Sequence, residues 1–259
     1  MGLYAVCAAK GSPGVSTAAV ALGLAWTVPA VVADLDPAGG DLGLRYRDGE
    51  GRPLDPDRGL MSLAAAVRRG SEGADVAEHL QLAGGGLPLL LGVSRPEQVT
   101  ALGTSWQHVA HSLATMPGAD VVADCGRVLP GSATMPILTR ADAILILTRP
   151  AMEDLYHLRE RLRALTESMR LRDIGAVPVG VAVLTGDRDR ASIPDVQRVI
   201  GAAGLPALVL GAFAFEPKSA AALRHGLDVN VRKSLLLRSA AAIGEALRGL
   251  AATRAARVA

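Results

Sequence analysis

The sequence predicts an α/β fold: a doubly wound, mainly parallel sheet of seven strands with helices on both faces. Short β-branched and apolar runs alternate along the chain with helical patterns, and this rhythm is typical of parallel strands joined by crossover helices. The apolar runs are nearly continuous, as in strands that are covered on both faces. With 259 residues, of which 50% are hydrophobic, the chain has enough apolar surface to form one large core.

The strands are predicted from seven apolar runs, at residues 3–9, 30–35, 87–93, 120–124, 143–148, 177–184 and 207–215. A helix over residues 152–171 is predicted by apolar residues that recur at spacings of three and four: Leu155, Leu158, Leu162, Leu165 and Met169. The last segment repeats this pattern and is expected to pack on the sheet through Leu236, Ala240, Ile243, Leu247 and Leu250.

The domain organisation is expected to be simple. Residues 45–59 are rich in glycine, proline and charge, which predicts an exposed loop and not a linker between domains. We therefore expect a single domain over residues 1–259, with the tail 252–259 frayed.

Charge and cysteine content narrow the functional class. The formal net charge of +2 neither requires nor excludes nucleic acid as a partner. No apolar run approaches the roughly 20 residues needed to span a bilayer, and no leader pattern is seen at the start, so we expect a soluble cytoplasmic protein. Cys7 and Cys125 lie in apolar runs without paired spacing, and we expect small core residues and neither a disulfide nor a zinc site.

The main chemical signal lies in the loop after the first strand. Residues 10–17 read Lys-Gly-Ser-Pro-Gly-Val-Ser-Thr and precede a helical run over residues 18–26. A glycine-bearing loop between a strand and a helix directs backbone N–H groups at a phosphate, and the helix dipole favours the anion. Ser16 stands where a phosphate loop places its magnesium ligand. Val15, however, occupies the position of the usual lysine, so a cation at the terminal phosphates is missing.

Two further segments accompany this loop: Val-Val-Ala-Asp-Leu-Asp-Pro at residues 31–37 and Asp-Val-Val-Ala-Asp-Cys-Gly at residues 120–126. Together with Lys10, Gly11, Gly14, Ser16 and Thr17 they resemble the ParA/MinD family of deviant Walker A P-loop ATPases, with Ser12 and Val15 replacing a glycine and a lysine of the family's loop. Residues 86–92, followed by Pro96 and Glu97, are similar to the CpaE/TadZ pilus-positioning branch. Residues 214–217, followed by Ala221, Leu223 and Gly226, are similar to the family's nucleotide-side loop near the C-terminus.

The resemblance implies a role for each matching residue. Lys10 would reach across a dimer interface to the partner's nucleotide, Asp36 would orient the attacking water, and Asp124 would hold Mg²⁺ together with Ser16. Asp34 is expected to be structural. The ligands implied are ATP or ADP with Mg²⁺, and the residues implied in nucleotide binding are Gly11, Ser12, Pro13, Gly14, Val15, Ser16, Thr17, Thr185 and Pro217.

Two departures from the family pattern and one nearby arginine affect the expected activity. Val15 weakens charge neutralisation at the phosphates, which carries much of phosphoryl-transfer catalysis, so hydrolysis should be slow or absent. Thr185 stands where the family often has an adenine-reading asparagine, which leaves base specificity open. Arg127 follows Asp124 and either replaces part of the missing charge or is an ordinary surface arginine.

The leading interpretation is a nucleotide-binding homodimeric switch that positions or regulates a partner machine for pilus assembly, secretion, partitioning or division. Two alternatives stay open: a slow ATPase of the same family, and a scaffold that no longer binds nucleotide, a pseudo-ATPase. Nonspecific DNA binding is less favoured than a salt-bridged surface at Arg159, Arg161, Arg163, Arg170 and Arg172. The alanine-rich C-terminal stripe lacks Trp and Phe, so no membrane insertion is expected.

Overall fold

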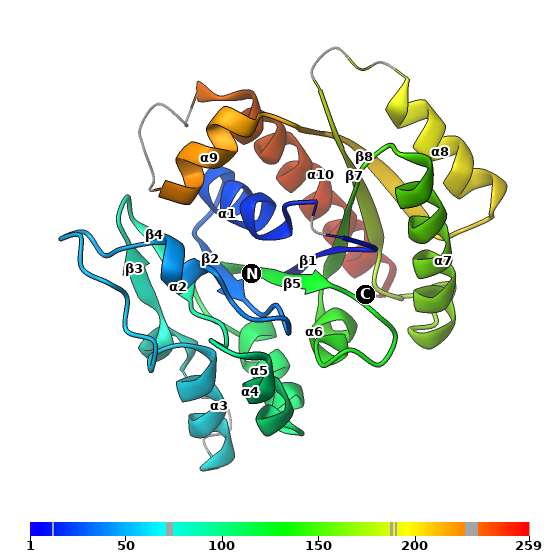
Figure 1. Cartoon of the computed structure of the whole chain (residues 1–259). Helices are drawn as coiled ribbons and strands as arrows, with labels where there is room; N and C mark the ends of the chain where they lie inside the picture. Colours follow the sequence, from blue (N-terminus) through cyan, green and yellow to red (C-terminus); the bar gives the residue numbers. More distant parts are fainter. Residues whose placement is uncertain (12, 71–74, 187–188, 190, 226–232, 259) are drawn as a thin grey trace.

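The structure is a computed structural model that describes residues 1–11, 13–70, 75–186, 189, 191–225 and 233–258. Within these residues one sheet runs through the molecule in the order β3-β4-β2-β5-β1-β6-β7-β8, and only β3 is antiparallel to its neighbour (Figure 1). The predicted α/β, doubly wound and mainly parallel fold is thus confirmed. The strands are β1 Leu3–Ala8, β2 Ala30–Asp34, β3 Gln81–Ala83, β4 Leu87–Leu90, β5 Asp120–Arg127, β6 Ala143–Thr148, β7 Val179–Thr185 and β8 Ala207–Ala214.

The described sheet has eight strands where seven were predicted. The additional strand, β3, has three residues and pairs only with β4 at the edge of the sheet. Its central residue, Leu82, is 60% exposed. A short edge strand that is open to solvent lacks the continuous apolar run by which the other strands were recognised.

Helices cover both faces of the sheet (Figure 1). One face carries α1 Val15–Ala25, α2 Leu42–Arg45, α9 Pro217–His225 and α10 Leu235–Val258. The other carries α3 Leu60–Arg68, the 3₁₀ helix η1 Val76–His79, α4 Pro96–Leu102, α5 Ser105–Ala114, α6 Met135–Arg140, α7 Met152–Ser168 and α8 Ser192–Ala202. No helix among the described residues combines the length and the apolar character needed to cross a bilayer.

The strands supply the core to both faces because successive side chains point to opposite sides. In β1, Cys7 packs under α5, α6 and α7, whereas Val6 packs under α1 and α10. Cys7 and Cys125 are both buried and unbonded, which confirms their expected place in the core. Burial raises the pKa of the Cys7 thiol to about 12, so it stays protonated and inert.

Three local predictions need correction. The helix predicted to end at residue 171 ends at Ser168, because Arg170 adopts the left-handed conformation with φ 54°. The tail beyond residue 252 is helical to Val258 and not frayed. Arg254 holds it in place by donating to the carbonyls of Gly175 and Ala141, at 2.8 Å each.

The segment 45–59 is also less exposed than predicted, since it contributes Tyr46 and Leu54 to the core beside α1. The Tyr46 hydroxyl donates a hydrogen bond of 2.7 Å to the carbonyl of Leu223 in α9. Through this hydrogen bond the segment after α2 packs against α9.

Candidate functional site

The loop between β1 and α1 has the backbone geometry of an anion site. Gly14, the N-cap residue of α1, has φ 97° and ψ 38°, a left-handed conformation that glycine adopts at little cost. Its carbonyl accepts the first helical bond from the Ala18 amide at 2.8 Å. No side chain caps this helix. The amides of the first turn are therefore left for an external acceptor, as at helix ends that bind phosphate.

A cavity of about 680 Å³ opens over this loop. It lies at the carboxyl ends of β1, β2 and β5, where the connections leave β1 and β5 towards opposite faces of the sheet. Open α/β sheets bind ligands at such switch points. The wall includes five loop residues and side chains from four other segments: Gly11, Gly14, Val15, Ser16, Thr17, Asp36, Arg45, Gly126, Arg127 and Arg224.

Asp124 is the most deeply buried carboxylate beside the cavity, with no exposed surface. Its Oδ1 accepts from the Gly126 amide at 3.0 Å, while its Oδ2 is buried without a partner. Burial raises the pKa of Asp124, the nearby charge of Asp34 raises it further, and the facing Ser16 hydroxyl offsets part of the rise. A carboxylate oxygen without a partner next to a hydroxyl is a donor set that suits hydrated Mg²⁺.

The remaining ligands of such an ion would have to come from elsewhere. The described residues contain no group of three or more His, Cys, Asp or Glu side chains that could hold a metal. Magnesium commonly keeps several waters and binds through one or two carboxylates together with substrate phosphates. The residues present thus fit a magnesium ion that arrives with a phosphorylated ligand.

Asp36 reaches the same cavity from the end of β2, and Gly126 makes room for it. A Cβ atom at Gly126 would lie 2.3 Å from the Asp36 carboxyl carbon, and Gly126 itself has φ 59°. Any side chain at Gly126 would displace the carboxylate. The Asp36 Oδ1 also accepts from the Ala38 amide at 2.8 Å, which closes the turn after β2. Gly126, two residues after Asp124, therefore lets the Asp36 carboxylate lie at the cavity wall.

Asp34 is buried between the ends of the same strands. Its Oδ2 accepts from the Leu42 amide at 3.1 Å at the start of α2, in line with the structural role expected of it. Its Oδ1 has no partner. Burial raises the pKa of Asp34, and the neighbouring Asp36 charge adds to the rise.

The other loop residues differ in exposure. Lys10 is exposed, and the described residues include no ion pair that involves it. Val15 is 6% exposed and packs in the core under α1 while it also borders the cavity. Ser12 and Gly226, both named from the sequence, lie outside the described residues.

A smaller pocket of about 150 Å³ adjoins the loop on the side of α9. It shares Gly14, Thr17 and Arg224 with the larger cavity, so the two hollows meet at these residues. Among the residues predicted from the sequence, Pro13 and Pro217 line it.

Thr185 lies next to the smaller pocket without lining it, since its carbonyl accepts a 2.8 Å hydrogen bond from the amide of Phe215, which does line that pocket. It borders a separate hollow with Asp189, and its hydroxyl donates to the Asp189 Oδ2 at 2.6 Å. Hydrogen bonds from Ser192 and Thr185 lower the pKa of the Asp189 carboxyl. The hydroxyl is therefore already engaged within the chain.

Sequence reasoning missed Arg45 and Arg224 at the cavity wall. Arg45 forms an ion pair with Asp41, one helical turn away. Arg224 follows the motif residue Leu223 directly but matches no motif position itself, so the sequence offered no signal for it beyond its charge.

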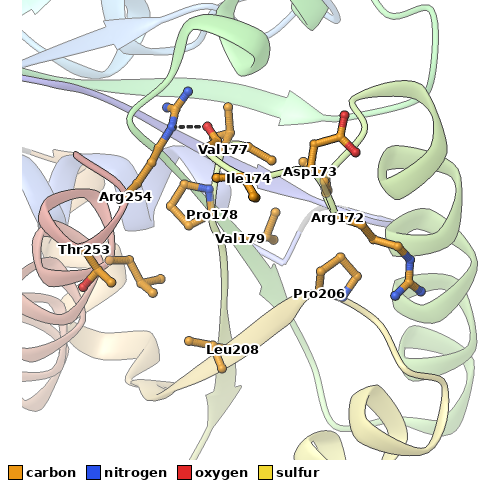
Figure 2. Close-up of a pocket in the computed structure, with 14 residues that line it drawn as sticks. Arg172, Asp173, Ile174, Val177, Pro178, Val179, Pro206, Leu208, Thr253 and Arg254 are labelled. Atoms are coloured by element: carbon orange, nitrogen blue, oxygen red, sulfur yellow. Dashed lines mark hydrogen bonds between the residues drawn. The ribbon is translucent and has the colours of Figure 1, made fainter. Parts of the chain in front are cut away.

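Another hollow, of about 510 Å³, lies at the opposite edge of the sheet, at the amino ends of β7 and β8 (Figure 2). Its arginines are already bonded to the backbone. Arg254 donates to the Gly175 carbonyl, drawn as a dashed line in Figure 2, and Arg172 donates to the carbonyl of Gly204 at 2.8 Å. This hollow offers no phosphate loop and no carboxylate without a partner, so the candidate site is the cavity over α1.

No family model matches the sequence, and no curated protein matches it either. Solved structures match at low identity. The ParA family ATPase from Chlorobium tepidum has a TM-score of 0.72 at 16% identity, over 95% of this chain and 97% of its own. The chain has the fold of ParA-type ATPases. This ParA/MinD fold is seen also in the Pyrococcus furiosus cell division ATPase MinD, with a TM-score of 0.70 at 18% identity over 96% of this chain and 100% of its own.

A third structure shows the same fold with ligands. Cobyrinic acid a,c-diamide synthase from Mycobacterium smegmatis, with bound ATP analogue and magnesium, has a TM-score of 0.66 at 18% identity, over 96% of this chain and 94% of its own. The ParA/MinD fold is thus one that can bind a nucleotide with a magnesium ion.

Proposed function

We propose that this chain is a ParA/MinD-like switch that binds ATP or ADP with Mg²⁺ and acts as a homodimer on a partner machine. The observation that carries the proposal is the pairing of an uncapped, glycine-started α1 with the buried Asp124, whose Oδ2 has no partner and whose neighbour is the Ser16 hydroxyl. A phosphate and a magnesium ion are the groups that such a pairing accommodates.

The proposed roles follow from where each side chain lies. The amides of Gly14 to Thr17 bind the phosphates, and Pro13 and Pro217 border the base. Ser16 and Asp124 hold the ion, which when bound would neutralise phosphate charge. Asp36, at the cavity wall beside Gly126, orients a water molecule. Val15 supplies no charge, so we expect hydrolysis to be weak or absent.

Dimerisation is proposed from Lys10. Its side chain is exposed at the mouth of the site and forms no ion pair within the described chain, which leaves it free to contact the phosphates bound by a second copy. Nucleotide would then hold two copies together, and the assembled pair would be the state that a pilus, secretion, partitioning or division complex recognises.

The decisive experiment is calorimetric titration with ATP, ADP and a nonhydrolysable analogue, with and without magnesium, together with a phosphate-release assay. Binding without turnover supports the switch. Measurable turnover supports the slow ATPase instead. If none of the three ligands binds, the proposal fails and the nucleotide-free scaffold replaces it.

Sedimentation separates the dimer from simple nucleotide binding. Wild type should shift to a dimer with ATP, whereas Lys10→Ala should stay monomeric at the same nucleotide occupancy. Lys218→Ala and Lys233→Ala serve as controls of equal charge change and should dimerise normally. A Lys10→Ala protein that dimerises like wild type contradicts the nucleotide sandwich.

A further inference from the structure

Arg224 lies where the two hollows of the site meet. It lines the cavity over the phosphate loop and also the smaller pocket beside α9. Gly14 and Thr17, which border both hollows as well, place this junction at the start of α1. A ligand that extends from the small pocket into the large cavity has to pass this arginine.

The backbone beside Arg224 is held firmly. Leu223 is 1% exposed and packs in the core under α1, and its carbonyl accepts the 2.7 Å bond from the Tyr46 hydroxyl. Burial raises the pKa of Tyr46 to about 12, so the phenol stays protonated and keeps donating at neutral pH. The last turn of α9 is thereby anchored, while the Arg224 side chain itself is exposed.

Charge pairing distinguishes Arg224 from Arg45 at the same wall. Arg45 is neutralised by its ion pair with Asp41. Arg224 forms no ion pair with any residue that the structure describes. Next to it the phosphate loop presents Val15 instead of a cation. A guanidinium without an ion pair among the described residues thus borders a helix N-terminus that favours anions.

We propose that Arg224 binds the phosphate chain of a nucleoside diphosphate or triphosphate, and that it brings a positive charge from α9 to a site whose loop carries Val15 in place of a cation. This inference rests on the proposed nucleotide binding. Because Arg224 stands at the junction and not at the far end of the cavity, it contacts the phosphates nearest the nucleoside. ADP and ATP therefore depend on it equally, whereas adenosine does not.

The test is calorimetric titration of Arg224→Ala with Mg-ATP, Mg-ADP and adenosine beside wild type. Loss of a charge-assisted phosphate contact should weaken both nucleotides by about 10- to 100-fold and leave adenosine unchanged. Arg224→Lys keeps the positive charge but not the planar guanidinium, so its affinity for both nucleotides should lie between those of wild type and Arg224→Ala. Arg198→Ala, at an exposed arginine of α8 outside both hollows, is the matched control and should bind as wild type does.

Each result decides the matter. If wild type binds nucleotide and Arg224→Ala binds ADP and ATP with unchanged affinity, Arg224 has no such role although the proposed function stands. An equal loss for adenosine would mean that Arg224 shapes the pocket and does not bind phosphate. If wild type binds neither nucleotide, both this inference and the proposed function are wrong. Thermal melts without ligand should coincide for all variants, because the Arg224 side chain is exposed.

Discussion

Strand β5 carries two buried aspartates, Asp120 as its first residue and Asp124 in its carboxyl-terminal half, and their hydrogen-bonding partners differ. At the amino end, Asp120 accepts from the Gly2 amide and from the Trp26 indole, both at 2.8 Å, and lies 3.4 Å from Arg248. At the carboxyl end, Asp124 is more deeply buried, yet its Oδ2 has no partner. Leaving a buried polar atom unpaired costs free energy.

The same contrast extends across the edges of the sheet. Arg254 and Arg172 at the amino edge are bonded to backbone carbonyls, whereas Arg224 at the carboxyl edge has no ion pair within the described residues. Polar groups at the amino edge stabilise the fold, and we propose that those at the carboxyl edge bind a ligand. Substitutions at the two edges should accordingly act on different measurable quantities.

The largest effect is expected at the amino end. Asp120→Ala leaves the Trp26 indole and the Gly2 amide without an acceptor and removes the charge beside Arg248, so the free energy of unfolding should fall by about 3 kcal/mol. Denaturant unfolding measures it. The shift in melting temperature caused by Mg-ATP should match that of wild type, and a diminished shift would break the distinction between the two ends.

Asp124→Asn should have the converse effect. The change keeps the shape of the side chain but removes the charge that draws the metal, so the increase in nucleotide affinity on adding magnesium should drop by about 10- to 100-fold. Titration with and without magnesium measures this. Asp189→Asn, which alters a carboxylate outside the two hollows, is the control. Unchanged magnesium dependence in Asp124→Asn would remove Asp124 from the site.

Val15→Lys adds a positive charge at the carboxyl edge of the sheet. Val15 borders the cavity, and a lysine can extend its methylenes along the wall and place its ammonium near the phosphates. ATP affinity should rise about tenfold, equivalent to about 1.4 kcal/mol. Val15→Met adds similar length without charge and should bind as wild type does. If the lysine variant folds but gains no affinity, the missing cation is not what limits binding.

A pH-dependent effect is expected at Asp34, the buried neighbour of Asp124. Because burial raises its pKa in the folded protein, the folded state binds this proton more tightly than the unfolded state, in which aspartate titrates near about pH 4. Wild type should therefore lose stability as the pH rises from about 4 through the raised pKa. Asp34→Asn cannot lose a proton, so its melting temperature should exceed that of wild type at neutral pH.

Asp34→Asn should be more stable than wild type at neutral pH, and this gain in the free energy of unfolding should vanish near pH 4. Melting curves across this range measure it. Asp57→Asn, at an exposed aspartate, should show no such trend. A constant difference at every pH would mean that the Asp34 charge does not govern stability.

The fold class, the long helices and the glycine-bearing loop before α1 could be predicted from the sequence alone. These features depend on hydrophobic periodicity and on the order of residues within short segments, and both can be identified in the sequence without knowledge of the structure. The positions of Asp36 and Asp124 could be predicted too, since both lie near the carboxyl ends of apolar strands, β2 and β5, which must lie at one edge of a parallel sheet. The three-residue strand β3 was not predicted, because a short, exposed edge strand has no continuous apolar run.

Which polar groups have hydrogen-bonding partners depends on the tertiary structure. The Asp120 carboxylate meets the Trp26 indole 94 residues away in sequence, and the Tyr46 hydroxyl that anchors α9 meets Leu223 at a separation of 177 residues. The tertiary structure likewise pairs the Thr185 hydroxyl with Asp189 and the Arg254 side chain with the carbonyl of Gly175. It also places Arg224 where the two hollows meet. Hydrogen bonds and packing contacts form only between groups a few ångströms apart. Which groups come that close depends on how the helices pack on the sheet. Residues that are far apart in sequence can therefore pair in a way that a short stretch of sequence does not show.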